Sequence, residues 1–130
     1  MKARILIVED NQPNRELLSD WLEAEGFEVL PAENMQQSFA ALQNEEVDAV
    51  LLDVQLGADD GLTVATWMRN QPALRNVPII AVTAHAMVTD HERVLNAGCN
   101  GCVSKPIDFS QLREQLNRWL GQPAYSPPVS

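Results

Sequence analysis

The stretch "ILIVEDN", residues 5–11, places four aliphatic residues directly before two carboxylates, Glu9 and Asp10. A continuous apolar run of this length predicts a strand buried on both faces, as in a parallel sheet. Charged side chains are costly to bury unless they are paired or bind a metal ion. The end of this strand is therefore a candidate functional site.

Beyond this stretch, short apolar runs alternate with segments of helical periodicity. The first predicted helix places Leu17, Leu18, Trp21 and Leu22 at the spacing of one apolar face. Such alternation favours an α/β fold in which helices cover both faces of a parallel sheet. We predict strands at 4–8, 27–32, 47–54, 77–84 and 101–104, and helices at 11–26, 35–44, 62–70, 90–97 and 108–120.

Two segments lack this periodicity. The sequence "GADDG", residues 57–61, predicts a turn between the third strand and the third helix. Residues 121–130 are rich in proline and serine, which is typical of a flexible tail or a linker. We therefore expect one domain over residues 1–120, followed by that tail.

Composition limits the classes of partner. The chain has 130 residues, 45% of them hydrophobic, which suits one globular domain with a substantial core. Its net charge of −9 argues against general affinity for nucleic acid or anionic membranes, since both are negative. Because we find neither a signal peptide nor an apolar segment of membrane length, we expect a soluble, cytoplasmic protein.

The two cysteines form a CxxC pair, "CNGC", from Cys99 to Cys102. Such a pair is half of a zinc site, which His85 and His91 could complete, or a redox motif if it opens a helix after a strand. Here it precedes a predicted strand instead. We therefore expect two reduced cysteines that pack in the domain.

Chemically active side chains follow four of the five predicted strands. Glu9 and Asp10 end the first strand and Asp53 the third, while Thr83 ends the fourth and Lys105 follows the fifth. In an open α/β sheet the carboxyl ends of the strands form the ligand-binding edge. We expect these five side chains to meet there.

Three carboxylates in one place require a positive partner. Two carboxylates about 4 Å apart repel by about 4 kcal/mol at an effective dielectric constant near 20. One lysine does not balance three acids, whereas a hard divalent cation does, and Mg²⁺ prefers oxygen ligands. A Mg²⁺ site beside a third carboxylate, a hydroxyl and an amine suits phosphoryl transfer.

The sequence resembles the receiver domain of two-component response regulators over residues 3–120. Four motifs carry the resemblance: "ILIVEDN", "AVLLDVQL" with "DDG", "IIAVTAHAM" and "AGCNGCVSKPID". The resemblance implies a doubly wound, flavodoxin-like sheet of five parallel strands in the order 2-1-3-4-5, with five helices. "TAHAM" is most similar to receivers of hybrid kinases and of stand-alone relay proteins.

The same resemblance implies roles for the acids. Asp53 would accept a phosphoryl group from a phosphohistidine of a histidine kinase or a histidine phosphotransfer protein. Asp10, Asp53 and the backbone carbonyl of Gln55 would ligate Mg²⁺, and Glu9 would act through water. The chemistry would be limited to the domain's own phosphorylation and dephosphorylation, so the domain would not be an enzyme acting on other substrates.

It also implies a switch. Lys105 would pair with the bound phosphoryl oxygens, Thr83 would hydrogen-bond to them, and a downstream protein would bind the face of helix 4, strand 5 and helix 5. His85 would flank the phosphoryl group with Gln55. The Lys105–Pro106 bond is expected to be cis, because Lys105 must turn inward at once from the fifth strand and X–Pro makes a cis bond cheap.

The chain departs from the family pattern at three positions. Gly57 stands where proline is usual, Asp59 where an apolar residue is usual, and Cys102 where an aromatic switch residue is usual. We therefore expect a looser, more acidic loop after Asp53, and a switch that works by a backbone shift of residues 84–90 and the fourth helix.

Two other functions fit the same fold. A Mg²⁺-dependent phosphatase would need a separate general acid and a cap over the substrate, and no insertion is long enough for a cap. A degenerate receiver acting only as an interaction module would not need the complete set of acids, threonine and lysine found here.

Overall fold

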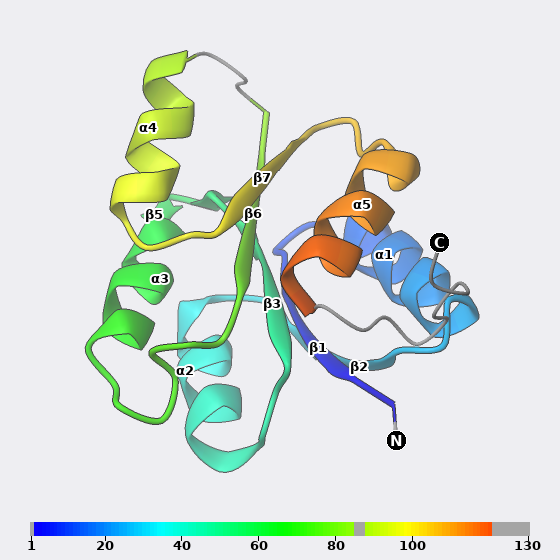
Figure 1. The fold of residues 1–130 in the computed structure, drawn as a ribbon, viewed down its shortest axis with the longest axis horizontal. Helices are drawn as coiled ribbons and strands as arrows, with labels where there is room; N and C mark the ends of the chain where they lie inside the picture. The colour runs from blue at the N-terminus through cyan, green and yellow to red at the C-terminus, as the bar shows by residue number, and fades with distance from the viewer. Residues whose placement is uncertain (1, 85–87, 121–130) are drawn as a thin grey trace.

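Five parallel strands form the central sheet of the computed structural model, which describes residues 2–84 and 88–120 (Figure 1). The strands are β1 (Arg4–Val8), β2 (Glu28–Ala32), β3 (Ala49–Asp53), β6 (Ile79–Thr83) and β7 (Gly101–Ser104). Their spatial order is β2-β1-β3-β6-β7, which confirms the predicted order 2-1-3-4-5. The predicted tail at residues 121–130 lies outside the described residues.

Helices cover both faces of the sheet, as predicted. They are α1 (Gln12–Ala24), α2 (Met35–Asn44), α3 (Leu62–Arg69), α4 (Val88–Asn96) and α5 (Phe109–Leu120). In Figure 1, α1 and α5 lie on one face of the sheet, and α2, α3 and α4 lie on the other. None of the described helices is long and apolar enough to cross a membrane.

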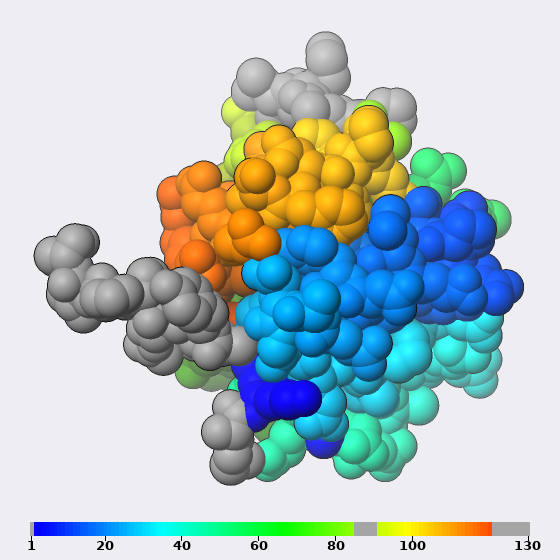
Figure 2. Space-filling view, turned by 90° about the vertical axis from the view of Figure 1, so that its right-hand side faces the viewer, coloured from blue at the N-terminus to red at the C-terminus, as the bar shows by residue number. Residues whose placement is uncertain are grey.

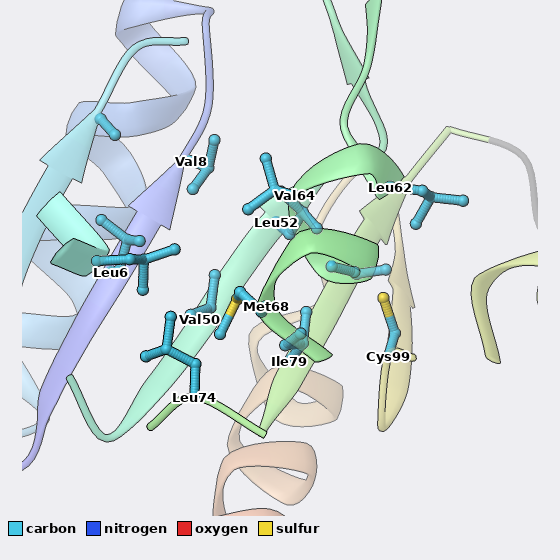
Figure 3. Close-up of a cluster of buried hydrophobic side chains, with 14 of the residues drawn as sticks. Leu6, Val8, Val50, Leu52, Leu62, Val64, Met68, Leu74, Ile79 and Cys99 are labelled. Carbon is cyan, nitrogen blue, oxygen red and sulfur yellow. The ribbon is translucent and has the colours of Figure 1, made fainter. Parts of the chain in front are cut away.

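The strand of "ILIVEDN" is buried on both faces. Ile5 and Ile7 pack in a cluster with residues of α1 and α5, whereas Leu6 and Val8 pack in a second cluster with residues of α2, α3 and α4. Because successive side chains of a strand point to opposite faces, both faces need apolar residues. Figure 3 shows the second cluster, in which Met68 of α3 lies over the sheet.

Helix α1 begins where its sequence predicts. Asn11 caps it, since its side-chain oxygen accepts a hydrogen bond from the backbone N–H of Asn14 at 3.0 Å. Leu18 and Leu22 are buried, but the expectation that Leu17 shares their face is wrong, because Leu17 is 54% exposed. Adjacent helix residues lie about 100° apart around the axis, so Leu17 falls outside the buried stripe.

Helices α1 and α5 lie side by side, and Figure 2 looks onto the face that they form. The rings of Trp21 and Phe109 have centroids 5.0 Å apart. Arg113 of α5 donates two hydrogen bonds to the carboxylate of Glu25, at 2.8 and 3.0 Å. These contacts join the first and last helices of the described chain.

The segment predicted as a turn forms a small hairpin. Strands β4 (Gln55–Leu56) and β5 (Asp59–Asp60) pair in antiparallel fashion, with Gln55 opposite Asp60. Gly57 has a φ of +61°, which residues with a side chain rarely adopt. The hairpin follows β3 directly, so it lies beside the carboxyl edge of the sheet.

Arg69 at the end of α3 joins the loops at the opposite edge. Its guanidinium donates hydrogen bonds to the backbone carbonyls of Leu74, Arg75, Val77 and Gly98 and to the side chain of Asn100. This one side chain therefore connects the loop before β6 to the loop between α4 and β7.

Among the described strands, β2 is an edge strand that pairs only with β1. It contains Pro31, which lies opposite Ile7 in the register. Proline cannot donate a backbone hydrogen bond, so within sheets it is found at edges. The N–H of Glu28 donates to the carbonyl of Ala3, so the N–H of Glu28 points toward β1.

Candidate functional site

The carboxyl ends of the strands open into a cavity of about 550 Å³. The five side chains that the sequence predicts at this edge all line it, and they come from four different strand ends. Residues of the β4–β5 hairpin, of α4 and of the start of α1 also line it. The predicted residues are Glu9, Asp10, Asp53, Thr83 and Lys105.

Three carboxylates form the centre of the site. One carboxylate oxygen each from Glu9, Asp10 and Asp53 can be chosen so that all lie within 4.8 Å of one another. Glu9 and Asp53 are only 2% and 4% exposed, whereas Asp10 is exposed. Two of the three acids therefore lie in the protein interior, where charge is difficult to stabilise.

Lys105 lies between the two buried acids. Its ammonium nitrogen Nζ donates a hydrogen bond to Asp53 Oδ2 at 2.9 Å and lies 3.3 Å from Glu9 Oε1. The backbone N–H of Lys105 also donates to the carbonyl of Thr83 at 2.8 Å, which holds the residue at the end of β7. The Lys105–Pro106 bond is cis, as predicted.

The environment shifts proton affinities within this group. Burial, reinforced by hydrogen bonding and by the charge of Asp53, raises the pKa of Glu9 from its ordinary value of 4.5 to about 7. Although burial disfavours the charged ammonium of Lys105, its contacts with Asp53 and Glu9 raise the pKa of this lysine. The site is therefore short of positive charge.

The donor set fits a divalent cation. Glu9 Oε1 is a buried atom that has no hydrogen-bond partner among the described residues, although the Lys105 ammonium lies nearby. Buried polar atoms are normally satisfied, so such an atom indicates space for a ligand. Carboxylate oxygens are the ligands that hard cations such as Mg²⁺ prefer. Glu9, Asp10 and Asp53 could thus hold a metal ion.

The loop after Asp53 is held by the site itself. The backbone N–H of Gln55 donates to Asp53 Oδ1 at 3.0 Å, so both oxygens of Asp53 accept hydrogen bonds.

Thr83 is 5% exposed and lines the cavity. Cys102 does not line the cavity: it is partly buried against the cluster of Figure 3. His85 lies outside the described residues.

Two charged residues of the cavity wall were not predicted from the sequence. Asp60 of the hairpin and Arg93 of α4 form an ion pair, and both line the cavity. Nothing in the local pattern of either segment predicts this contact, because the residues are 33 positions apart. Cys99 and Cys102 form no disulfide with each other, and burial raises the pKa of Cys99 to about 12.

Comparisons with known proteins agree with this geometry. A family model described as "Response regulator receiver domain" matches residues 5–117. The polar-differentiation response regulator DivK of Brucella anthropi is 37% identical over 121 residues, which cover 93% of this chain and 98% of DivK.

Solved structures give the same result. The receiver domain of the sensor histidine kinase PA1611 from Pseudomonas aeruginosa, which has a magnesium ion coordinated in its active site cleft, superimposes with a TM-score of 0.85. It is 34% identical, over 94% of this chain and 100% of that one. A CheY-like receiver domain protein from Methanospirillum hungatei is 27% identical, with a TM-score of 0.84 over 93% and 95% of the two chains.

Proposed function

Because the chain belongs to the response regulator receiver domain family, a family of signalling modules that are generally not enzymes, we propose that it accepts a phosphoryl group on Asp53. The donor is a phosphohistidine of a histidine kinase or of a histidine phosphotransfer protein. The observation that carries the proposal is the contact of Asp53 with Lys105 beside Glu9 and Asp10, inside a cavity open to a donor.

In the transfer, a carboxylate oxygen of Asp53 attacks phosphorus and forms a P–O bond. The P–N bond to the donor imidazole breaks, and the imidazole nitrogen keeps the bonding electron pair. Lys105 Nζ, which lies 2.9 Å from Asp53 Oδ2, neutralises charge on the phosphoryl oxygens as they arrive. The backbone N–H of Gln55 fixes the orientation of the carboxylate through Oδ1.

Mg²⁺ is the cofactor that the proposal assigns to the three acids. Asp10, Asp53 and the backbone carbonyl of Gln55 would hold it, with Glu9 acting through water. When bound, the ion shields the acids from the phosphoryl oxygens and helps to position the transferred group. The buried oxygen of Glu9, which has no hydrogen-bond partner among the described residues, and the clustered carboxylates support this assignment.

The output would follow from Thr83. Thr83 lines the cavity. Its hydroxyl would hydrogen-bond to a phosphoryl oxygen and would thereby pull on the segment that leads to α4. We propose α4, β7 and α5 as the face that a downstream protein binds. His85, outside the described residues, would tune phosphoryl lifetime together with Gln55. The proposed setting is the cytoplasm, which suits two cysteines, Cys99 and Cys102, that form no disulfide.

Mass spectrometry tests the proposal. With acetyl phosphate and Mg²⁺ the chain should gain one phosphoryl group, and Asp53→Asn should abolish the gain. Asp59→Asn is the matched control, because Asp59 is an exposed acid that lines the same cavity. Labelling that persists in Asp53→Asn contradicts the assignment. No labelling of the parent indicates an interaction module, and steady release of phosphate from phosphate esters indicates a phosphatase.

A further inference from the structure

A second cation lies at the rim of the cavity that contains Asp53. Arg93 projects from α4, and its Nη2 donates a hydrogen bond to Asp60 Oδ2 of the hairpin. Both residues line the same cavity as Asp53. The ion pair therefore joins α4 to the hairpin at the entrance of the site.

The two partners differ in how firmly they are held. The other carboxylate oxygen of Asp60 accepts a hydrogen bond from the backbone N–H of Leu62 at 3.0 Å, which fixes Asp60 at the start of α3. Arg93 is a long side chain that is 52% exposed. Ion pairs as exposed as this one contribute little to stability, so Arg93 can leave Asp60 at small cost.

The charges of the cavity favour such a departure. Among its described lining residues, the cations are Lys105 and Arg93, against five acids. A phosphoryl group on Asp53 adds up to about two negative charges and three acceptor oxygens. Lys105 must also serve Asp53 and Glu9, so it does not balance the new charge alone, and Arg93 is the other cation among the described lining residues.

We propose that Arg93 is a second phosphoryl-binding residue, which exchanges its carboxylate partner Asp60 for the oxygens of a phosphoryl group on Asp53. This inference rests on the proposed function of Asp53. A guanidinium can offer two parallel N–H donors to phosphate oxygens. It therefore binds a phosphoryl group more strongly than it binds a half-exposed carboxylate such as that of Asp60. Since Arg93 belongs to α4, the exchange separates α4 from the hairpin and carries phosphorylation to the helix.

Beryllium fluoride, which binds to a carboxylate and imitates a phosphoryl group, gives a direct measurement. We expect Arg93→Gln to weaken its binding in the presence of Mg²⁺ by about tenfold, the scale of one lost charge-assisted contact. Asp60→Asn should strengthen binding, because it removes the competing charge while an amide oxygen can still accept from the Leu62 N–H. Binding is measured by calorimetry or by fluorine NMR.

Two further variants control the test. Arg113→Gln removes a cation that is also 52% exposed and ion-paired, but with Glu25 and away from the cavity, so its affinity should equal that of the parent. Arg93→Lys keeps the charge without the paired donors and should lose less affinity than Arg93→Gln. If Arg93→Gln does not fold, Arg93→Lys and Asp60→Asn still give opposite shifts.

The outcomes separate the two proposals. If Arg93→Gln and Asp60→Asn both strengthen binding, the pair only latches the resting form and the exchange is wrong. Unchanged affinity in both variants also overturns it, while leaving phosphorylation of Asp53 intact. A parent chain that neither binds beryllium fluoride nor becomes labelled on Asp53 overturns the proposed function itself, and the exchange with it.

Discussion

Gly61 approaches the backbone of Asp53 so closely that a β-carbon on Gly61 would lie 1.9 Å from the Asp53 carbonyl oxygen. The N–H of Gly61 donates to the carbonyl of Val54 at 2.6 Å, which closes the hairpin segment back onto the end of β3. The loop that carries Gln55 and Asp60 is thus packed against the residue on which the chemistry is proposed.

Replacing Gly61 with alanine should therefore destabilise the chain. We expect Gly61→Ala to lower the free energy of unfolding by about 1–3 kcal/mol, the usual cost of overpacking, because backbone atoms must move apart. Gly57→Ala is the matched comparison: it meets only ordinary contact at 3.8 Å and is strained through its positive φ alone. Urea denaturation measures both. If Gly61→Ala and Gly57→Ala lower the free energy of unfolding equally and also affect labelling of Asp53 equally, this view is contradicted.

The raised pKa of Glu9 predicts a pH-dependent stability. The folded chain binds the Glu9 proton more tightly than the unfolded chain, so protonation favours folding. Without metal, the contribution is fully present below about pH 4.5 and is lost as the pH rises to about 7. We expect a loss of about 1–3 kcal/mol across this window, which Glu9→Gln should remove. The free energy of unfolding is measured against pH by denaturation with a chelator present. If it depends on pH in the same way in the parent and in Glu9→Gln, this prediction is contradicted.

Mg²⁺ should stabilise the parent more than it stabilises a chain with one acid fewer. Asp10→Asn relieves repulsion among the three acids, so it should stabilise the metal-free chain by about 1 kcal/mol. Millimolar Mg²⁺ should then stabilise the parent more than the variant, since binding favours the folded state. Asp59→Asn, outside the three clustered acids, is the control. Thermal melting with and without Mg²⁺ decides, and identical responses reject the metal site.

The absence of an aromatic residue at Cys102 predicts where the switch acts. Cys102 is small and partly buried, so it cannot swing into space that Thr83 vacates. With beryllium fluoride, amide chemical shifts should change at Asp53 and also in residues 88–98. Thr83→Ala should reduce those changes and weaken binding of the downstream partner more than Cys102→Tyr does. Changes confined to Asp53, or a larger effect of Cys102→Tyr on partner binding, would show that the switch works differently.

The sheet and the acids were predictable because both are encoded locally. An apolar run such as residues 5–8 indicates a strand buried on two faces whatever its neighbours are, and the parallel topology brings Glu9, Asp53 and Lys105 to one edge. The helix bounds follow from apolar spacing and caps such as Asn11, and they agree with the structure within two residues.

The contacts that sequence patterns missed are those between distant charged residues. In the sequence, nothing distinguishes Arg69 from an ordinary helical residue. In the structure, its guanidinium donates hydrogen bonds to both loops at the far edge of the sheet. Asp60 and Arg93 meet only because the hairpin folds back toward α4. Periodicity reports which face of an element is apolar, but it does not report which side chains from other elements lie opposite a polar face.

Pro31 has a consequence for how the molecule behaves at high concentration. Alternate N–H groups of a strand point to opposite sides, and the Glu28 N–H points toward β1, so positions 29 and 31 point away from the sheet. Proline has no N–H, which leaves Val29 as the single outward donor within β2. This edge therefore offers few donors to a strand of another molecule, which disfavours edge-to-edge aggregation through β2.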